Sequence, residues 1–121
     1  MSITTIATNP ASEATTKVFD HHLGAFAQGL DELMKDYDDR SVIVTPDQSC
    51  LGTGEIRGFF KAFLDNAKPA FWEAFKVTSK RTEGEIAYLV WEARPFVSMA
   101  TDTLLVRDGK ILVQTFTAFS A

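Results

Sequence analysis

An acid and a histidine that fall on otherwise apolar faces are the residues most able to do chemistry. Alternation along a strand-like stretch places Asp102 on the same side as Leu104 and Val106. A carboxyl group on such a face is either a pocket acid, with a pKa raised by loss of solvent, or a carboxylate paired with a neighbour such as Arg94 or satisfied at the rim. The first interpretation predicts a general acid or hydrogen-bond donor.

Two adjacent histidines occur in a predicted helix, where neighbours point about 100° apart. The spacing places His22 on the apolar stripe, between Val18 and Phe26, and leaves His21 on its flank. A histidine in that position is either a hydrogen-bonded core residue or a proton-transfer group. His22 would form a proton-transfer pair with Asp102 if the two meet in the folded chain.

Weaker chemical signals come from a lone cysteine, a turn aspartate and a glycine-rich segment. Cys50 is expected to be a small buried residue, because no motif accompanies it. Asp47 is expected to be a solvated turn residue, although it could supply a pocket carboxylate if the turn folds inward. Residues 52–54 lack the lysine of a phosphate-binding loop, so they are expected to form a turn and helix entry. Acidic residues at the end of the second helix are expected to form a solvated face: Asp36, Asp38 and Asp39.

Hydrophobic periodicity predicts the elements that would position these residues. Spacings of three and four predict helices at residues 13–28, 30–37 and 52–66, the last ended by Pro69. Strands are expected from β-branched and alternating runs at residues 42–45, 49–51, 72–80, 85–94, 97–107 and 110–119. Hairpin turns are expected at residues 82–84 and 107–110. Helices first and strands afterwards predict an α+β fold, with helices on one face of a curved sheet.

The chain length predicts one domain. Its 121 residues suffice for a single core. Residues 1–11 lack periodicity and are expected to be a flexible leader, and residues 12–121 to form the domain, with Ser12 able to cap the first helix.

Charge and targeting features exclude several classes of protein. Twelve basic and sixteen acidic residues give a net charge of −4, which argues against nucleic acid as a partner. There is no signal-peptide pattern and no run of apolar residues long enough to cross or anchor in a membrane, so we expect a cytoplasmic protein without membrane partners. A single cysteine excludes an internal disulfide.

The order of elements and five local motifs resemble the nuclear transport factor 2-like (NTF2-like) superfamily, which includes ketosteroid isomerases and SnoaL-like polyketide cyclases. The resemblance covers about residues 13–119, and the motifs lie at residues 29–33, 37–42, 46 and 52–60 and at Asp102 followed by residues 108–111. It implies a cystatin-like cone, in which N-terminal helices pack on a strongly curved mixed or antiparallel sheet, usually within a homodimer.

The same resemblance suggests roles for three residues. Asp102 falls at the oxyanion acid of the isomerases, and SnoaL-like cyclases also use a pocket aspartate as acid and base. His22 falls at the position of a helix-one tyrosine. Thr45 falls at the position of the catalytic base, but a threonine hydroxyl cannot take a carbon-bound proton at neutral pH, so the isomerase mechanism does not carry over unchanged.

These features together predict a protein that binds a small apolar ligand. Ten phenylalanines are available to pack the helices, line a cone or cover the outer sheet face, and the exposed outer face predicts a homodimer. The activity expected is isomerisation or cyclisation of a carbonyl-bearing substrate, with Asp102 and His22 as catalytic residues; a non-catalytic binding or dimerisation module is the alternative. No cofactor is expected, and no spacing of metal ligands accompanies the histidines. The residues expected to contact the ligand are Tyr37, Thr45, Phe59, Phe63, Trp91 and Phe116.

Overall fold

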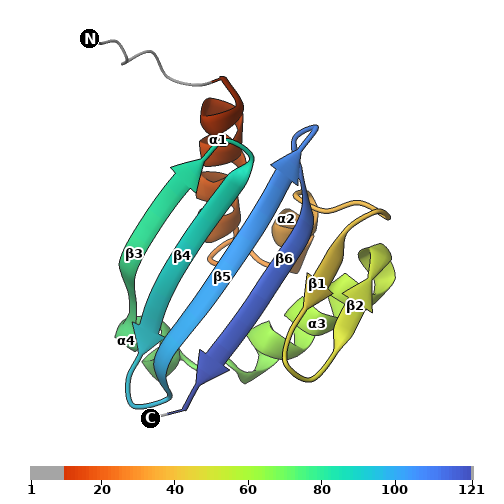
Figure 1. Cartoon of the computed structure of the whole chain (residues 1–121). Helices are drawn as coiled ribbons and strands as arrows, with labels where there is room; N and C mark the ends of the chain where they lie inside the picture. Colours follow the sequence, from red (N-terminus) through yellow and green to blue (C-terminus); the bar gives the residue numbers. More distant parts are fainter. Residues whose placement is uncertain (1–9, 121) are drawn as a thin grey trace, which may run out of the picture.

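A computed structural model of the chain describes residues 10–120, so most of the predicted leader, residues 1–9, lies outside the described residues. Four helices and six strands follow one another along the chain (Figure 1). The helices are α1 (Pro10–Ala25), α2 (Leu30–Met34), α3 (Gly52–Asn66) and α4 (Pro69–Ala74). The strands are β1 (Val42–Val44), β2 (Ser49–Leu51), β3 (Phe75–Glu83), β4 (Ile86–Ala93), β5 (Val97–Arg107) and β6 (Lys110–Phe119).

The six strands form one mixed sheet in the order β2-β1-β6-β5-β4-β3. All neighbours are antiparallel except β1 and β6, which run parallel. Register shifts interrupt the β3–β4, β4–β5 and β5–β6 ladders, and such bulges bend a sheet. The helices lie on one face of the sheet and leave the other open (Figure 1). The predicted α+β fold with a curved mixed sheet is confirmed.

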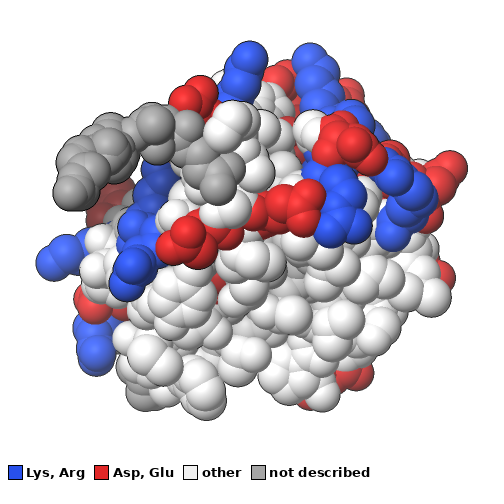
Figure 2. Space-filling model, turned by 45° about the horizontal axis from the view of Figure 1, so that its top comes forward, with Lys and Arg blue, Asp and Glu red and all other residues white. Residues whose placement is uncertain are grey.

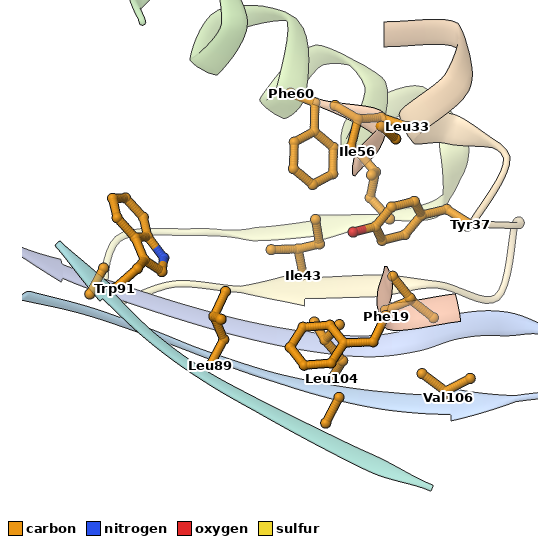
Figure 3. Packing of buried hydrophobic residues seen from close by; sticks show 14 of the residues in the cluster. Phe19, Leu33, Tyr37, Ile43, Ile56, Phe60, Leu89, Trp91, Leu104 and Val106 are labelled. Carbon is orange, nitrogen blue, oxygen red and sulfur yellow. The ribbon is translucent and has the colours of Figure 1, made fainter. Parts of the chain in front are cut away.

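The two faces of the sheet differ in the residues that they present. On β5 the buried side chains alternate, and Ala100, Asp102, Leu104 and Val106 face the helices. Large apolar side chains on the opposite face stay partly exposed. The core therefore lies between the helices and the inner face of the sheet, where Phe19 of α1, Phe60 of α3 and residues of β4 and β5 pack together (Figure 3). Asp102 shares a face with the core, as its alternation predicts.

The turn between β5 and β6 has the backbone conformation that its sequence predicts. Asp108 and Gly109 both have positive φ, at 55° and 74°. A type I′ hairpin turn needs this conformation at both central residues, and Asp-Gly adopts it readily. The turn sets the pairing of Arg107 with Lys110, and the register shift between Leu105 and Val106 then brings Asp102 opposite Phe116.

The start of the third strand, predicted at residue 72, was predicted wrongly. Residues 69–74 form the short helix α4 rather than a loop and the beginning of a strand, and β3 starts only at Phe75. Pro69 ends α3 as predicted but also begins α4, because proline fits the first helical turn, where no backbone N–H is needed. The helix places Phe71 and Trp72 against the core.

The first helix also begins earlier than predicted, at Pro10. Ser12 lies inside this helix, and its hydroxyl oxygen accepts a hydrogen bond from the backbone N–H of Gly84, 2.8 Å away. Ser12 therefore ties α1 to the β3–β4 turn.

Candidate active site

A cavity of about 510 Å³ lies between the helices and the inner face of the sheet. α1, α3 and α4 supply one wall, and β3, β4, β5 and β6 supply the other. Most of the lining is aromatic or aliphatic, with three polar side chains among it. The lining residues are His22, Leu23, Phe26, Ala27, Phe59, Phe60, Phe63, Trp72, Phe75, Leu89, Trp91, Asp102, Gln114 and Phe116.

Asp102 is the sole carboxyl group in this lining. The side chain is 8% exposed, and each of its oxygens accepts one hydrogen bond. Trp91 Nε1 donates to Oδ1 over 3.0 Å, and Gln114 Nε2 donates to Oδ2 over 2.9 Å. A pairing with Arg94, the alternative considered from the sequence, is wrong, because Arg94 is exposed and contacts Glu92 and the Ser98 carbonyl oxygen.

A line of hydrogen bonds connects Asp102 to His22 without a direct contact between the two. Gln114 uses its N–H on Asp102 and accepts the hydroxyl proton of Tyr37 at Oε1. Tyr37 Oη lies 3.5 Å from His22 Nδ1. Since Tyr37 donates its proton to Gln114, this contact is compatible with the neutral tautomer of His22 that carries its proton on Nδ1. His22 Nε2 then carries a lone pair, and no described residue hydrogen-bonds to it.

Burial reverses the usual order of the pKa values of Asp102 and His22. Loss of solvent raises the pKa of Asp102 to about 6, although the hydrogen bonds from Trp91 and Gln114 oppose the change. Loss of solvent also lowers the pKa of His22 to about 4, with a smaller contribution from the charge of His21. At neutral pH His22 is therefore neutral, and roughly a tenth of Asp102 is protonated.

Four of the aromatic residues expected to contact a ligand line the cavity: Phe59, Phe63, Trp91 and Phe116. The Trp91 and Phe116 rings stack nearly parallel, at an interplanar angle of 8°. Tyr37, which was also expected to contact a ligand, is not a lining residue. It is buried between α3 and the sheet, and its hydroxyl group contacts Gln114 and His22 (Figure 3).

Thr45 lies away from the cavity, in the turn after β1. Its hydroxyl oxygen accepts hydrogen bonds from the backbone N–H groups of Asp47 and Gln48. Asp47 is exposed, so the turn does not fold inward. Neither residue supplies a second carboxyl or hydroxyl group to the cavity.

Gln114 is a central member of the site that the sequence reasoning missed. It is 2% exposed and connects Asp102 with Tyr37. A signal for it exists in the sequence, since Gln114 is a polar residue two positions before Phe116, on the same face of an apolar strand. Trp72 was also missed, because it was assigned to a strand.

A second titratable cluster joins α1 to α2 outside the cavity lining. His21 Nδ1 lies 2.8 Å from both carboxylate oxygens of Asp36, and Nε2 lies 2.6 Å from Glu32. The hydrogen bonds with Glu32 and then Asp36 raise the pKa of His21. Asp36 is buried, so the prediction of a fully solvated acidic face is wrong for this residue. Asp38 and Asp39 instead contact Arg40 and Thr53 at the surface.

Between residues 10 and 120, no three histidine, cysteine or acidic side chains come together as metal ligands. No described helix is long and apolar enough to cross a membrane.

Comparison with solved structures identifies the architecture. An NTF2-like protein of unknown function from Mesorhizobium loti superposes with a TM-score of 0.75 at 15% identity, over 93% of this chain and 97% of that chain. The chain has the NTF2-like fold. A putative ketosteroid isomerase from Kribbella flavida has a TM-score of 0.67 at 14% identity, over 91% of this chain and 81% of that one. A putative polyketide cyclase from Sinorhizobium meliloti has a TM-score of 0.67 at 15% identity, over 83% and 93%. No family model and no curated protein matches the sequence.

In this NTF2-like chain the cavity occupies the space between the helices and the curved sheet, with Asp102 on the sheet and His22 on the first helix. Identities of this size establish the fold and leave the chemistry to be argued from the side chains.

Proposed function

We propose that this chain binds a small, largely apolar, carbonyl-bearing molecule in the cavity and isomerises or cyclises it by proton transfer at Asp102. The observation that carries the proposal is a buried carboxyl group with a pKa of about 6 in a wall made mainly of aromatic rings. Groups with a pKa near the working pH are efficient general acids and bases. The neighbouring folds named as a putative ketosteroid isomerase and a putative polyketide cyclase support a carbonyl substrate.

The hydrogen bonds to Asp102 suit both of its protonation states. The protonated carboxyl can donate its proton to a substrate carbonyl oxygen, where negative charge develops as a neighbouring C–H proton passes to a solvent water, and the enol that forms is then reprotonated at carbon. After the proton is transferred, the N–H groups of Trp91 and Gln114 stabilise the carboxylate that remains. Because the two donors are held by the sheet, no rearrangement is required when the charge changes.

His22 acts in this proposal as a neutral orienting group. Its pKa of about 4 makes it a weak base, but Nε2 can accept a hydrogen bond from a hydroxyl or enol group of the ligand. The contact with Tyr37 is compatible with a lone pair on Nε2. Asp102 and His22 would thus offer one donor and one acceptor on opposite walls of an apolar cavity.

A non-catalytic binding protein is the second candidate. A carbon acid usually needs a strong base as well as an acid, and the cavity lining contains no carboxyl group besides Asp102. Thr45, at the base position implied by the resemblance, lies in a turn. The open volume of about 510 Å³ favours ligand binding in either case, since such volumes are typical of small-molecule sites.

Ligand binding can be measured directly with the protein's own fluorescence. The chain has two tryptophans, and both line the cavity. Titration with flat apolar ketones is therefore expected to change tryptophan emission saturably, with dissociation constants at or below the micromolar range. A Phe63→Ala variant, which removes one wall of the cavity, should weaken binding. Absence of any saturable change across steroid-like and naphthyl ketones would rule out the cavity as a binding site for this class.

We also propose that two copies of the chain associate through the outer face of the sheet. Charged side chains gather around the end that carries the hairpin turns, and the sheet surface below them is largely uncharged (Figure 2). Large apolar side chains that are at least 36% exposed on this face include Ile86, Tyr88, Met99, Val113 and Phe119. A contiguous apolar surface of this kind is typical of an interface.

If the homodimer forms through the outer face, a single charge introduced on that face should disrupt it, whereas a charge elsewhere on the sheet should not. Val113→Glu is expected to convert a dimer into a monomer, measured by sedimentation velocity, because it buries an unpaired carboxylate between the sheets. Val77→Glu is the control, since Val77 is similarly exposed, at 38% against 36%, but pairs with Trp91 at the sheet edge. A wild-type protein that sediments as a monomer at high concentration would contradict the proposal.

The location proposed from the sequence is the cytoplasm. Cys50 is a free, buried thiol on β2, and burial raises its pKa, which suits a protein that stays reduced.

A further inference from the structure

A second hollow adjoins the cavity along α3. Its volume is about 590 Å³, and it lies between α3, β2 and the end of β6. Its lining is more polar than that of the cavity. The lining residues are Gln48, Ser49, Cys50, Glu55, Gly58, Phe59, Ala62, Phe63, Asn66 and Phe116. We refer to it below as the α3 groove.

The cavity and the α3 groove share one wall. Phe59, Phe63 and Phe116 line both. Phe59 and Phe116 meet edge to face, with ring centroids 6.4 Å apart, and all three side chains are only partly buried. The two volumes therefore meet at partly exposed rings, so a ligand that extends past these rings can contact both hollows.

The polar groups of the α3 groove favour uncharged partners. Glu55 is its one charged side chain, and Glu55 Oε1 already accepts the backbone N–H of Leu51 over 2.8 Å. Asn66 donates to the Ala62 carbonyl oxygen, which leaves its own side-chain oxygen as an acceptor. The Ser49 hydroxyl makes no hydrogen bond to any described residue. Hydroxyl groups can pair with these acceptors, whereas an anionic group would meet a carboxylate without a compensating cation.

We propose that the α3 groove is a second compartment of the binding site, which receives the neutral, hydroxyl-bearing end of a ligand whose flat apolar part fills the cavity. The proposal rests on the proposed function, because it requires the cavity to hold the apolar part. It defines the ligand class as an elongated amphipathic molecule, with rings at one end and a hydroxylated tail at the other. A carboxylate or phosphate at the tail is disfavoured.

Two glycines of α3 provide a matched pair of variants. Gly58 lines the groove, and a Cβ added there meets nothing within 4 Å, so Gly58→Leu places a side chain in the groove. Gly54 lies one turn earlier on the same helix, also with open space, and lines neither hollow. Both substitutions replace a helical glycine and should raise Tm slightly, which confirms folding.

Four naphthyl ethers serve as probes, read out by tryptophan fluorescence. One carries only a methyl group, and three carry the same longer tail, ended by a hydroxyl, a methyl or a carboxylate group. In wild type we expect the hydroxyl-ended probe to bind roughly tenfold more tightly than the methyl-ended one, and the carboxylate-ended probe to bind most weakly of the three. Gly58→Leu should abolish the preference for the hydroxyl end without changing the affinity of the short probe, and Gly54→Leu should retain it.

The outcomes separate this proposal from the proposed function. If the short probe binds wild type but the tail end makes no difference, or if Gly58→Leu keeps the wild-type preference, the α3 groove is not part of the site and the cavity proposal stands. If neither the short probe nor the tailed probes bind wild type, both proposals fall. Glu55→Gln, which retains the acceptor for the Leu51 N–H, should improve binding of the carboxylate-ended probe selectively; an unchanged order would contradict the role of Glu55.

Discussion

Asp102→Asn is expected to lower kcat/KM for a proton-transfer reaction in the cavity on the order of 10²–10⁴-fold, the usual contribution of a general acid or base. Asparagine keeps the size of the side chain but cannot release a proton at neutral pH. Binding of an apolar ligand without a carbonyl group should change little, because the aromatic walls are untouched. The measurement is a comparison of kcat/KM for a β,γ-unsaturated polycyclic ketone with Kd for the matching hydrocarbon.

The pH dependence of ketone binding distinguishes an acid from a residue with a merely structural role. If protonated Asp102 donates to the carbonyl group, affinity for the ketone falls above pH 6, by up to tenfold for each pH unit, while affinity for the hydrocarbon stays constant. Asp36→Asn is the control, because Asp36 is a buried carboxyl group outside the cavity lining. Equal losses in the two variants, or full turnover in Asp102→Asn, would show that Asp102 does not serve as the acid.

In the wild-type protein, Asp102 and His22 are expected to change the free energy of unfolding in opposite directions as pH rises, so that their effects largely cancel. The pKa of Asp102 is raised from 3.8 to about 6 on folding, so its contribution to the free energy of unfolding falls as pH rises through this window. The pKa of His22 is lowered from 6.5 to about 4, so its contribution rises over nearly the same window. Each amounts to roughly 3 kcal/mol, at about 1.4 kcal/mol for each pH unit between the folded and unfolded pKa values.

Removing either Asp102 or His22 should make the pH effect of the remaining group on the free energy of unfolding measurable. In His22→Phe the free energy of unfolding, relative to wild type, is expected to decline by roughly 3 kcal/mol between pH 4 and pH 6.5. In Asp102→Asn it should increase by a similar amount. Neither residue is among the causes of the other's pKa change, so each change persists in the opposite variant. Chemical denaturation at a series of pH values measures both curves.

Differences from wild type remove the other titrating groups from this comparison. The raised pKa of Asp36 and the lowered pKa of Glu32 contribute in all three proteins alike, and the coupling between His21 and His22 is the smaller of the two causes of the His22 shift. Parallel curves for wild type and both variants would contradict the buried, perturbed state of Asp102 and His22.

The fold was predictable because it depends on short-range patterns. Alternation placed Asp102 and Leu104 on the buried face of β5, and Asp-Gly at residues 108–109 predicted the turn that joins β5 to β6. Helical spacing put His22 rather than His21 on the buried side of α1. Such patterns report which face of an element avoids water, and that information is local to each element.

The start of α4 shows where local patterns fail. Residues 71–75 contain three aromatic side chains, which have high strand propensity. The helix forms because Pro69 suits its first turn and because Phe71 and Trp72 pack on Phe63 and on each other from that backbone. Tertiary packing outweighs a difference in propensity that is small for each residue.

The sequence by itself determined the fold class, the inward positions of Asp102 and His22 and the aromatic character of the site. Only the tertiary structure decided how these groups are connected. Gln114 and Tyr37 link Asp102 to His22 across 80 positions of sequence, Thr45 lies outside the cavity, and the aromatic rings leave a volume of about 510 Å³ open. Hydrogen bonds and open volume depend on distances between elements that are far apart in the chain, and no spacing within one element encodes those distances.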